Sequence, residues 1–216
     1  MSIISLLFPT RELCYLCKDK TPYLTAFVCS ECSERLEFVY REVDIKSQYI
    51  KRTIFVLSYN SYLRELIHDF KFNGKSYMYK PFAEIMTEAI KKTDINYIDL
   101  IMYIPIHRRK EAIRGYNQSE LLAKYISQKL QIQISKGNLS KTAWTKEQNT
   151  LNRVQRLINL KNSFSISNTE EIQGKRILLI DDLITTGATF NECSKLLIES
   201  GAREVIALAL TSSKTI

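Results

Sequence analysis

The sequence predicts an α/β protein: a mostly parallel sheet with helices on both faces, preceded by a small module built around cysteines. Three apolar stretches carry the sheet prediction, at residues 99–106, 176–182 and 205–210. Strands that are apolar on both faces and alternate with helices are typical of parallel sheets covered on each side. Four of the five cysteines lie in a short N-terminal segment. We therefore expect two domains, one over residues 1–45 and one over residues 46–216.

Composition places the chain among ordinary globular proteins. Of its 216 residues, 45% are hydrophobic and 25% are charged, and only 6 Gly and 4 Pro occur, which excludes disordered, collagen-like and low-complexity classes. The longest apolar runs, Ile177–Ile180 and Val205–Leu210, are far shorter than the roughly 20 residues that cross a bilayer. The segment Ser2–Phe8 lacks the basic flank and the small-residue cleavage site of a secretory signal. We expect a cytoplasmic protein without a membrane span.

A strand and two helices are predicted in the first part of the larger domain. Thr53–Tyr59 (TIFVLSY) has the β-branched and aromatic composition of a strand. The helix after it is predicted by four apolar residues at helical spacing: Leu63, Leu66, Ile67 and Phe70. A second helix over Pro81–Lys92 begins with proline, whose missing amide costs nothing at a helix start.

Two further buried strands and two helices follow the strand Asp99–Ile106 (DLIMYIPI). Because both faces of these strands are apolar, we place them in the interior of the sheet. In chain order the remaining elements are a helix over Gln118–Leu130, at most a short strand over Ile132–Ile134, the strand Arg176–Asp182, a helix over Ala188–Ser200 closed by Gly201, and the strand Val205–Leu210.

The N-terminal cysteines have the spacing of a metal site. Two C-x2-C pairs, Cys14 with Cys17 and Cys29 with Cys32, are separated by eleven residues. Each pair can present two thiolates to one tetrahedral ion, which predicts a structural Zn²⁺ with a closed coordination sphere. A disulfide pair does not fit a chain without a secretion signal, and a thioredoxin-like redox site needs only one such pair. The fifth cysteine, Cys193, is expected to be a small packing residue in a helix.

The excess positive charge lies in one central stretch. Lys and Arg total 31 against 23 Asp and Glu. Between Arg108 and Lys161 there are 12 basic and 3 acidic residues, a balance of +9, so the rest of the chain, with 19 basic and 20 acidic residues, carries −1. Such a stretch fits a phosphate-bearing small molecule, nucleic acid or anionic lipid, or else a well-solvated surface.

The segment Ile177–Thr189 (ILLIDDLITTGAT) is the main candidate for a binding site. A buried strand ends in Asp181 and Asp182, and a Thr-rich loop with Gly187 leads into a helix. A plain strand-to-helix turn needs only one capping side chain, whereas several polar residues gather here. Loop amides and hydroxyls at a helix N-terminus bind phosphate, and acids beside them bind hydroxyls. Glycine allows the backbone to approach the phosphate closely. The pattern indicates a sugar-phosphate site at the carboxyl end of the strand.

This segment resembles the phosphoribosyl-pyrophosphate (PRPP) motif of the type I phosphoribosyltransferases. The wider chain resembles the ComF family, phosphoribosyltransferase-like proteins associated with natural competence, and is also similar to the transferase half of glutamine amidophosphoribosyltransferases. Besides the four cysteines and the PRPP motif, the resemblance covers Leu66–Gly74 (LIHDFKFNG), Ile104–Ser119 (IPIHRRKEAIRGYNQS), Thr145, Gln148, Leu151, Arg156 and Asn159–Phe164.

The resemblance implies a role for each part of the site. The ribose hydroxyls are expected at Asp181 and Asp182, and the 5′-phosphate at Thr185, Thr186, Gly187, Ala188 and Thr189. Pyrophosphate is expected at the loop His107–Arg114, through Arg108, Arg109 and Arg114. A flexible basic loop, Lys141–Arg156, would close over the leaving group with Lys141, Lys146 and Arg156. Mg²⁺ would accompany PRPP, held by few protein ligands such as Asp181 or Asp182.

One position departs from the family pattern: Ala143 stands where several relatives carry Arg, while Lys141 and Lys146 supply charge near it. Three functions therefore remain open. The first is a transferase that moves phosphoribosyl to an acceptor, and the second is a PRPP-binding protein without turnover in the handling of incoming DNA. The third is a single-stranded-DNA-binding protein that uses the basic stretch and the finger. The expected partners are PRPP, single-stranded DNA and proteins of DNA uptake or recombination.

Overall fold

The computed structural model describes residues 12–42, 45–93, 95, 97–144 and 163–213. Its central strands are β3 (Phe38–Glu42), β4 (Arg52–Ser58), β5 (Leu100–Tyr103), β8 (Arg176–Ile184) and β9 (Glu204–Ser212). They form one sheet in the order β3-β4-β9-β8-β5. β4, β9, β8 and β5 run parallel, and β3 adds one antiparallel edge. The predicted mostly parallel α/β sheet is confirmed.

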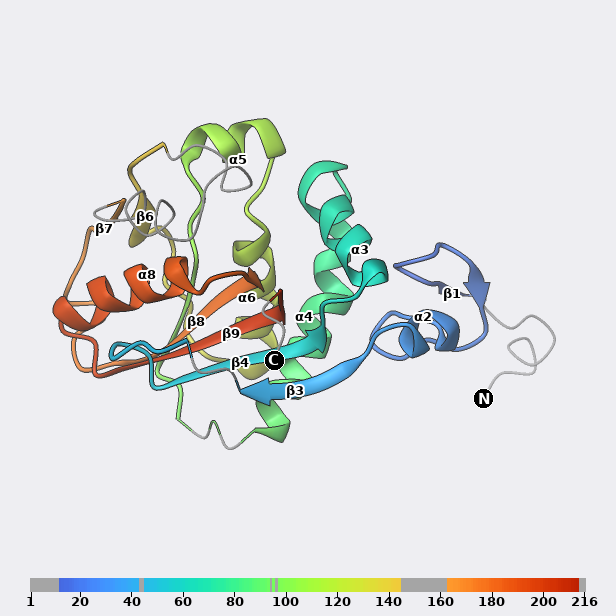
Figure 1. Cartoon of the computed structure of the whole chain (residues 1–216), viewed down its shortest axis with the longest axis horizontal. Coiled ribbons are helices and arrows are strands. Elements are labelled where there is room, and N and C mark those ends of the chain that lie inside the picture. Colours follow the sequence, from blue (N-terminus) through green and yellow to red (C-terminus); the bar gives the residue numbers. More distant parts are fainter. Residues whose placement is uncertain (1–11, 43–44, 94, 96, 145–162, 214–216) are drawn as a thin grey trace.

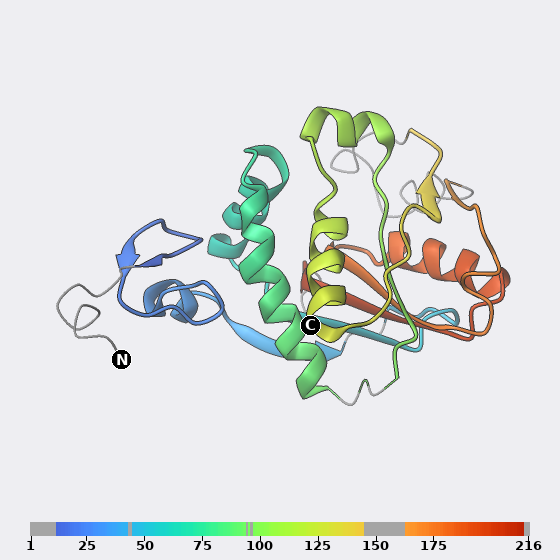
Figure 2. The same cartoon turned by 180° about the vertical axis from the view of Figure 1, so that it is seen from behind.

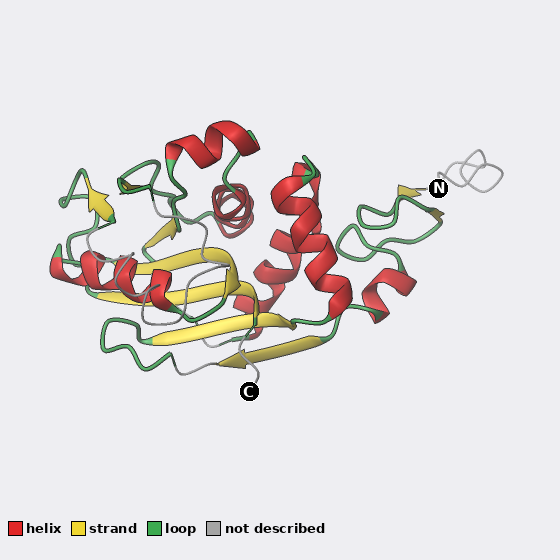
Figure 3. Cartoon of the chain, turned by 45° about the horizontal axis from the view of Figure 1, so that its top comes forward, coloured by secondary structure: helices red, strands yellow, loops and turns green. Residues whose placement is uncertain are grey.

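Helices cover both faces of the sheet, as Figures 1 and 3 show. Along β8, Leu178 and Ile180 belong to one apolar cluster and Ile177 and Leu179 to the other, because side chains alternate between the faces of a strand. Besides residues of the cysteine-bearing segment, the first cluster includes residues of three long helices, and the second includes residues of one. The three are α3 (Ser61–Phe72), α4 (Tyr79–Lys92) and α6 (Gln118–Leu130), and the one is α8 (Ala188–Glu199).

The cysteine-bearing segment forms a small finger at the end of the molecule away from α8 (Figures 1 and 2). It consists of β1 (Glu12–Leu13), β2 (Lys20–Thr21) and α2 (Ser30–Glu34) with the turns between them. Its Leu16, Val28 and Leu36 are buried in the same apolar cluster as residues of α3 and α4. The division at residue 45 stays a prediction, and the central sheet begins already at Phe38.

Three strands, β5, β8 and β9, end two or three residues away from the predicted positions, and β9 continues past Leu210 to Ser212. β5 stops at Tyr103 rather than at Ile106, because Pro105 has no N–H to donate to the sheet. β8 continues beyond Asp182 to Ile184, because β9 runs alongside it as far as Ser212. The two acids of the motif therefore lie inside a paired strand rather than at its end.

The helices agree more closely with the prediction. α6 has the predicted bounds, and all four apolar residues that predicted α3 are buried. α4 begins at Tyr79 after a 3-10 turn, η1 (Ser76–Met78), so Pro81 lies in its first turn, where amides have no partner within the helix. Cys193 is buried in α8, as expected. None of the described helices combines the length and apolar character that a membrane crossing requires.

The strand considered for Ile132–Ile134 is reduced to a single bridge between Ile134 and Ile101. A short antiparallel pair that the sequence did not predict lies nearby, β6 (Leu139–Lys141) with β7 (Phe164–Ile166). Its two strands are only three residues long and lie far apart in the chain, so no periodicity marks them.

Candidate functional site

The two acids of the motif point to opposite faces of the sheet. Asp181 pairs in register with Ala209 of β9, and the ladder continues regularly to Leu183 and Ile184. In a regular strand, neighbouring side chains alternate between the faces. Asp182 is accordingly buried toward α3, whereas Asp181 keeps part of its surface open. The fold therefore gives two adjacent carboxylates different surroundings.

Asp182 forms an ion pair with a lysine from α3. The Lys71 Nζ lies 2.8 Å from Asp182 Oδ1, and the Asp182 side chain is only 4% exposed. The second oxygen, Oδ2, is buried without a hydrogen-bond partner among the described residues. A buried carboxylate needs a compensating charge, and Lys71 supplies it here.

Asp181 is held by the start of α6. Its Oδ1 accepts hydrogen bonds from Ser119 Oγ at 2.6 Å and from the Asp182 amide at 2.9 Å. Burial of the carboxyl group and the neighbouring charge of Asp182 raise the pKa of Asp181, while Lys71 and these hydrogen bonds oppose the shift. The acid is thus accommodated by neutral donors and by one cation that it shares with its neighbour.

The loop after β8 leads directly into α8. Gly187 precedes the helix with φ of 80°, a left-handed conformation that suits glycine, and no side chain caps the helix there. The amide of Ala188, the first residue of α8, donates weakly to Thr186 Oγ1 of the loop at 3.3 Å. A helix of 12 residues with such an end is suited to bind a phosphate group.

The structure adds a second reason for glycine at position 187. A Cβ there would lie 3.0 Å from Cγ2 of Ile45, a residue of the connection between β3 and β4. The direction that a side chain would take is therefore occupied by Ile45. The sequence argument considered only the approach of a phosphate, and it did not anticipate this packing.

A cavity of about 650 Å³ lies between the end of β5, α5 and β6, and neither acid is among its lining residues. Arg108, Arg109 and Lys141, three of the cations implicated by the resemblance, are among its lining residues, together with Asn117. Asn117 connects this wall to the acids, because its Oδ1 accepts from the Ser119 amide at 3.0 Å. Burial and the nearby Lys110 lower the pKa of Lys141, while Cys193 and Asp181 oppose this shift.

The expected pyrophosphate loop His107–Arg114 is a helix for most of its length. α5 (Arg108–Arg114) is capped by His107, whose Nδ1 accepts from the Arg109 amide at 3.2 Å. It ends at Gly115, which has a left-handed conformation. Good helix formers between an N-terminal cap and a C-terminal glycine favour this outcome. The expectation of a loop was wrong, although the two arginines at the helix start still line the cavity.

Two side chains near this helix make other contacts than expected. Arg114 bonds to Gln118 Oε1, and its guanidinium lies 5.0 Å from the ring of Phe72, so it contacts α6 and the end of α3 rather than lining the cavity. The His107 ring packs edge-on against Trp144 with centroids 5.1 Å apart. Burial, Arg109, Arg108 and Lys141 lower the pKa of His107.

The other basic-loop candidates, Lys146 and Arg156, lie outside the described residues, as do Thr145, Gln148, Leu151 and the segment 159–162. Of the loop 141–156, the structure describes only residues 141–144. Within that part, Lys141 is held in β6 and Ala143 is half-buried.

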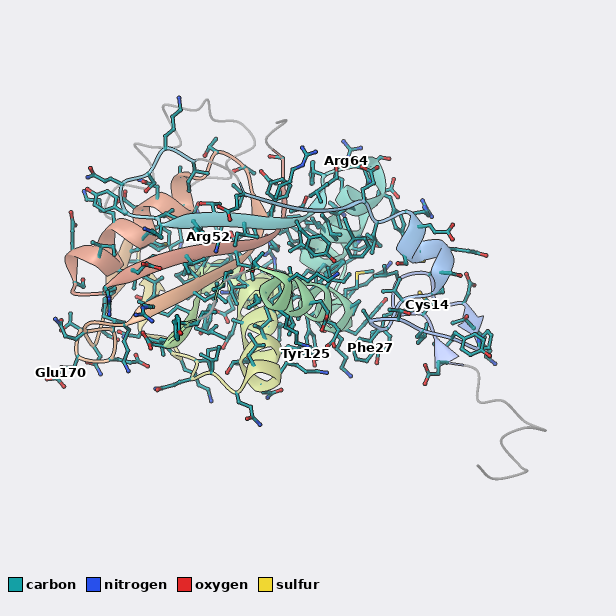
Figure 4. All side chains as sticks on the ribbon, turned by 90° about the horizontal axis from the view of Figure 1, so that it is seen from below. Cys14, Phe27, Arg52, Arg64, Tyr125 and Glu170 are labelled. Atoms are coloured by element: carbon teal, nitrogen blue, oxygen red, sulfur yellow. The ribbon has the colours of Figure 1, made fainter. Side chains whose placement is uncertain are left out.

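The four N-terminal cysteines come together in the finger, near the labelled Cys14 in Figure 4. The sulfurs of Cys14, Cys17, Cys29 and Cys32 all lie within 4.8 Å of one another, and none forms a disulfide. Burial raises the pKa of the Cys14 thiol, but amides of Cys29, Cys17 and Leu16 that donate to its sulfur bring it to about 7. The cluster is therefore arranged as a metal-binding site.

Comparisons with known proteins agree with this geometry. A family model described as a phosphoribosyl transferase domain matches residues 117–214. The DNA utilization protein YhgH of Escherichia coli is 31% identical over 159 residues, which cover 72% of this chain and 69% of that protein. The competence protein ComFC of Bacillus subtilis is 27% identical over 204 residues, which cover 91% of this chain and 82% of that protein. This chain belongs to the ComF family.

Solved structures are more distant. The structure titled as the allosteric regulatory enzyme of purine biosynthesis is 18% identical with a TM-score of 0.42, and the match covers 60% of this chain and 25% of that one. The chain thus spans about a quarter of that enzyme. The assignment to the ComF family accordingly depends on the sequence relatives.

The segments of the ComF pattern that the structure describes converge on the two acids. Tyr116 OH and Gln118 Nε2 both donate to the Phe70 carbonyl of α3, at 2.6 Å and 3.2 Å. Asn117 Nδ2 donates to the Ile104 carbonyl at 3.0 Å, just after β5. Together with the bond from Ser119 to Asp181, these contacts join α3, β5 and β8 through four consecutive residues, 116–119.

Two residues of the site were not identified from the sequence. Ser119 and Lys71 both lie in segments that carry the family resemblance, but no role was assigned to them. For Lys71 a signal was present, because it follows Ile67 by four positions and therefore borders the buried stripe of its helix. For Ser119 no local signal indicates a bond to a strand that lies about 60 residues later in the chain.

The packing at Gly187 predicts a graded effect on stability. We expect Gly187→Ala to lower the free energy of unfolding by about 1–2 kcal/mol through its left-handed backbone, and further through contact with Ile45. Gly174→Ala is the matched control, because Gly174 has φ of 67° and open space around its Cβ position. Urea denaturation measures both.

In the Gly187→Ala background, Ile45→Ala should remove the additional loss that distinguishes Gly187 from Gly174. Equal losses for the two single glycine variants would contradict the packing role of Ile45.

Proposed function

We propose that this ComF-family protein binds PRPP with Mg²⁺ and transfers the phosphoribosyl group to an acceptor with release of pyrophosphate. One observation carries the proposal: two acids, a Thr-rich loop and the N-terminus of α8 follow one another at the end of β8, and residues 117–119 connect Asp181 to a cavity lined by cations. Acids bind hydroxyls, a helix N-terminus binds phosphate, and cations bind pyrophosphate. PRPP carries all three groups.

The sugar and the 5′-phosphate have separate places in this proposal. The ribose hydroxyls are expected at the acids of β8, and the 5′-phosphate at the amides and hydroxyls of residues 185–189. Asp181 or Asp182 would hold Mg²⁺, which prefers oxygen ligands and needs few from the protein when phosphates supply the others. When bound, Mg²⁺ neutralises negative charge on the pyrophosphate.

The cavity supports a role in bond breaking. Cleavage of the glycosidic carbon–oxygen bond places positive charge on the ribose ring and negative charge on the departing pyrophosphate. Fixed cations that meet this developing charge lower the barrier. Arg108 and Arg109 at the start of α5 and Lys141 of β6 are the described residues in position to do so, with Lys146 and Arg156 of the basic loop as further candidates.

The names of the relatives indicate the process. One is called a DNA utilization protein and another a competence protein. We infer that this protein acts in DNA uptake, in the cytoplasm, with single-stranded DNA or proteins of uptake and recombination as partners.

A PRPP- or DNA-binding factor without turnover is the second candidate, and two observations favour it. Ala143 stands in the basic loop where several relatives carry Arg. At the finger, Lys18 Nζ lies 3.3 Å above the ring of Tyr77, and the rings of Tyr15 and Phe27 are adjacent. Cations among aromatic rings are typical of surfaces that bind single strands. Salt-dependent DNA binding that PRPP does not reduce would support this candidate.

The binding site is tested by calorimetry with PRPP and Mg²⁺. We expect the parent protein to bind PRPP, and Asp181→Asn to weaken binding by about 10- to 100-fold, the scale of one hydrogen bond to a charged group. Asp99→Asn is the control. Asp99 lies at the N-terminal ends of β5 and β8, away from the motif, where its carboxylate accepts a hydrogen bond from the Arg176 amide at 2.8 Å. No PRPP binding by the folded parent protein would contradict the proposal.

Turnover is tested at Lys141, which should stabilise the leaving group mainly as the bond breaks. We expect Lys141→Ala to lower pyrophosphate release by about 10- to 1000-fold while PRPP affinity changes little. The control is Lys136→Ala, since Lys136 is exposed in the connection before the same strand. An absence of pyrophosphate release by the parent protein with nucleobase, nucleoside and amine acceptors would favour the binding-only candidate.

We further propose that the four-cysteine cluster holds a structural Zn²⁺. With Zn–S bonds of about 2.3 Å, tetrahedral geometry places the sulfurs about 3.8 Å apart. The sulfurs of Cys17 and Cys29 are 3.8 Å apart, and all four fit within 4.8 Å. Four thiolates close the coordination sphere, so the metal would stabilise the finger rather than take part in the reaction.

Elemental analysis should find about one zinc per chain in reduced protein. Structural zinc contributes on the order of 10 kcal/mol to a small finger. We therefore expect Cys14→Ser to lose the metal and hydrogen-exchange protection over residues 12–36, with β8 and β9 still protected. Cys193→Ala, which changes a buried cysteine outside the cluster, should retain the zinc. A zinc-free, folded parent protein would exclude the site.

A further inference from the structure

The ion pair between Lys71 and Asp182 joins the last turn of α3 to the strand that carries the PRPP motif. The two charged atoms are 2.8 Å apart, and the side chains are 21% and 4% exposed. Bringing two charges into such a place has a desolvation cost that their attraction offsets only in part. Stability alone is therefore a weak reason for this pair, and a role at the site is a stronger one.

Lys71 binds one oxygen of the carboxylate, and the other oxygen has no partner among the described residues. Asp182 Oδ1 is bound to the lysine, whereas Oδ2 is buried and has no hydrogen-bond partner among the described residues. An ionised carboxylate oxygen can only accept hydrogen bonds, so a hydrogen-bonding partner of Oδ2 must be a donor. A sugar hydroxyl is such a donor, and a phosphate oxygen without a proton is not.

The position of Lys71 is itself determined by the segment that holds the other acid. The carbonyl of Phe70, the preceding residue, accepts from Tyr116 and Gln118. The next residue in that segment, Ser119, donates to Asp181. The same four residues therefore set the end of α3, and with it Lys71, relative to both acids.

We propose that Lys71 is a positioning residue for sugar recognition: it holds Asp182 so that Oδ2 accepts a ribose hydroxyl of PRPP. The inference rests on the PRPP binding proposed above. In this arrangement Asp182 binds the sugar and Mg²⁺ is left to Asp181, so Lys71 contributes to recognition of the sugar and not of the phosphates. Ligands with and without a sugar therefore distinguish this role from a general attraction of anions.

The test compares PRPP with inorganic pyrophosphate, each with Mg²⁺, by calorimetry. Lys71→Met should weaken PRPP binding by about 10- to 100-fold and leave pyrophosphate binding unchanged, because only PRPP carries the hydroxyls. Lys75→Met is the matched control. Lys75 lies just after α3 and also pairs with a carboxylate, that of Asp69 at 2.7 Å, but this pair does not reach β8. The Lys75→Met variant should bind PRPP and pyrophosphate with the affinities of the parent protein.

A double-mutant cycle shows whether Lys71 acts through Asp182. In the Asp182→Asn background, Lys71→Met should change PRPP affinity less than about 3-fold, because no carboxylate remains to be positioned. The double variant also removes both charges together, so it remains informative if Lys71→Met alone does not fold. Thermal denaturation confirms that each variant is folded.

The outcomes separate this inference from the proposed function. If the parent protein does not bind PRPP, the proposed function fails. If the parent binds PRPP and folded Lys71→Met binds it equally well, only the role of Lys71 is overturned. An equal loss of PRPP and pyrophosphate binding would also overturn it, since Lys71 would then attract anions generally. The role of Lys71 would also be overturned if Lys71→Met reduced PRPP affinity in the Asp182→Asn background as much as it does in the parent protein.

Discussion

Two neighbouring carboxylates near the end of β8 impose the electrostatic constraint on which the site depends. Burying a charge without a partner is costly, and two adjacent acids also repel each other. The regular strand directs their side chains apart, and each acid has its own partner: Ser119 for Asp181 and Lys71 for Asp182. The elements that supply these partners, α3 and α6, must therefore reach the end of β8 in a fixed arrangement.

That arrangement is set by a buried polar segment before and at the start of α6. Asn117, Gln118 and Ser119 are each at most 3% exposed, and each side chain has a hydrogen-bond partner. A fully satisfied buried network favours a single geometry, because any displacement leaves a polar group without a partner. Where α3, β5 and β8 meet, this segment provides directional hydrogen bonds in place of apolar packing. This explains how a site can be rigid although its residues come from distant parts of the chain.

The sequence predicted what depends on local pattern. α6 was placed with its bounds because its apolar residues recur at helical spacing, and the structure shows Asn117 as its cap. The PRPP motif was found because its polar residues are consecutive. The end of β8 was placed too early, since the additional length depends on pairing with β9. The helix α5 was overlooked although His107 and Gly115 are capping signals. The partners of the acids depend on contacts between distant segments, which periodicity cannot reveal.

The finger is joined to the site through α3, although it lies at the other end of the molecule from α8 (Figure 1). At the first turn, the cap residue Asn60 donates to the Arg35 carbonyl at 3.1 Å, and Tyr62 lies beside Cys32. At the last turn, Lys71 reaches Asp182. A helix of 12 residues spans about 18 Å and transmits a displacement along its axis with little bending. The cysteine cluster and the acids of the PRPP motif are therefore attached to opposite ends of one short rigid element, so a metal that orders the finger also helps to fix the helix that presents Lys71.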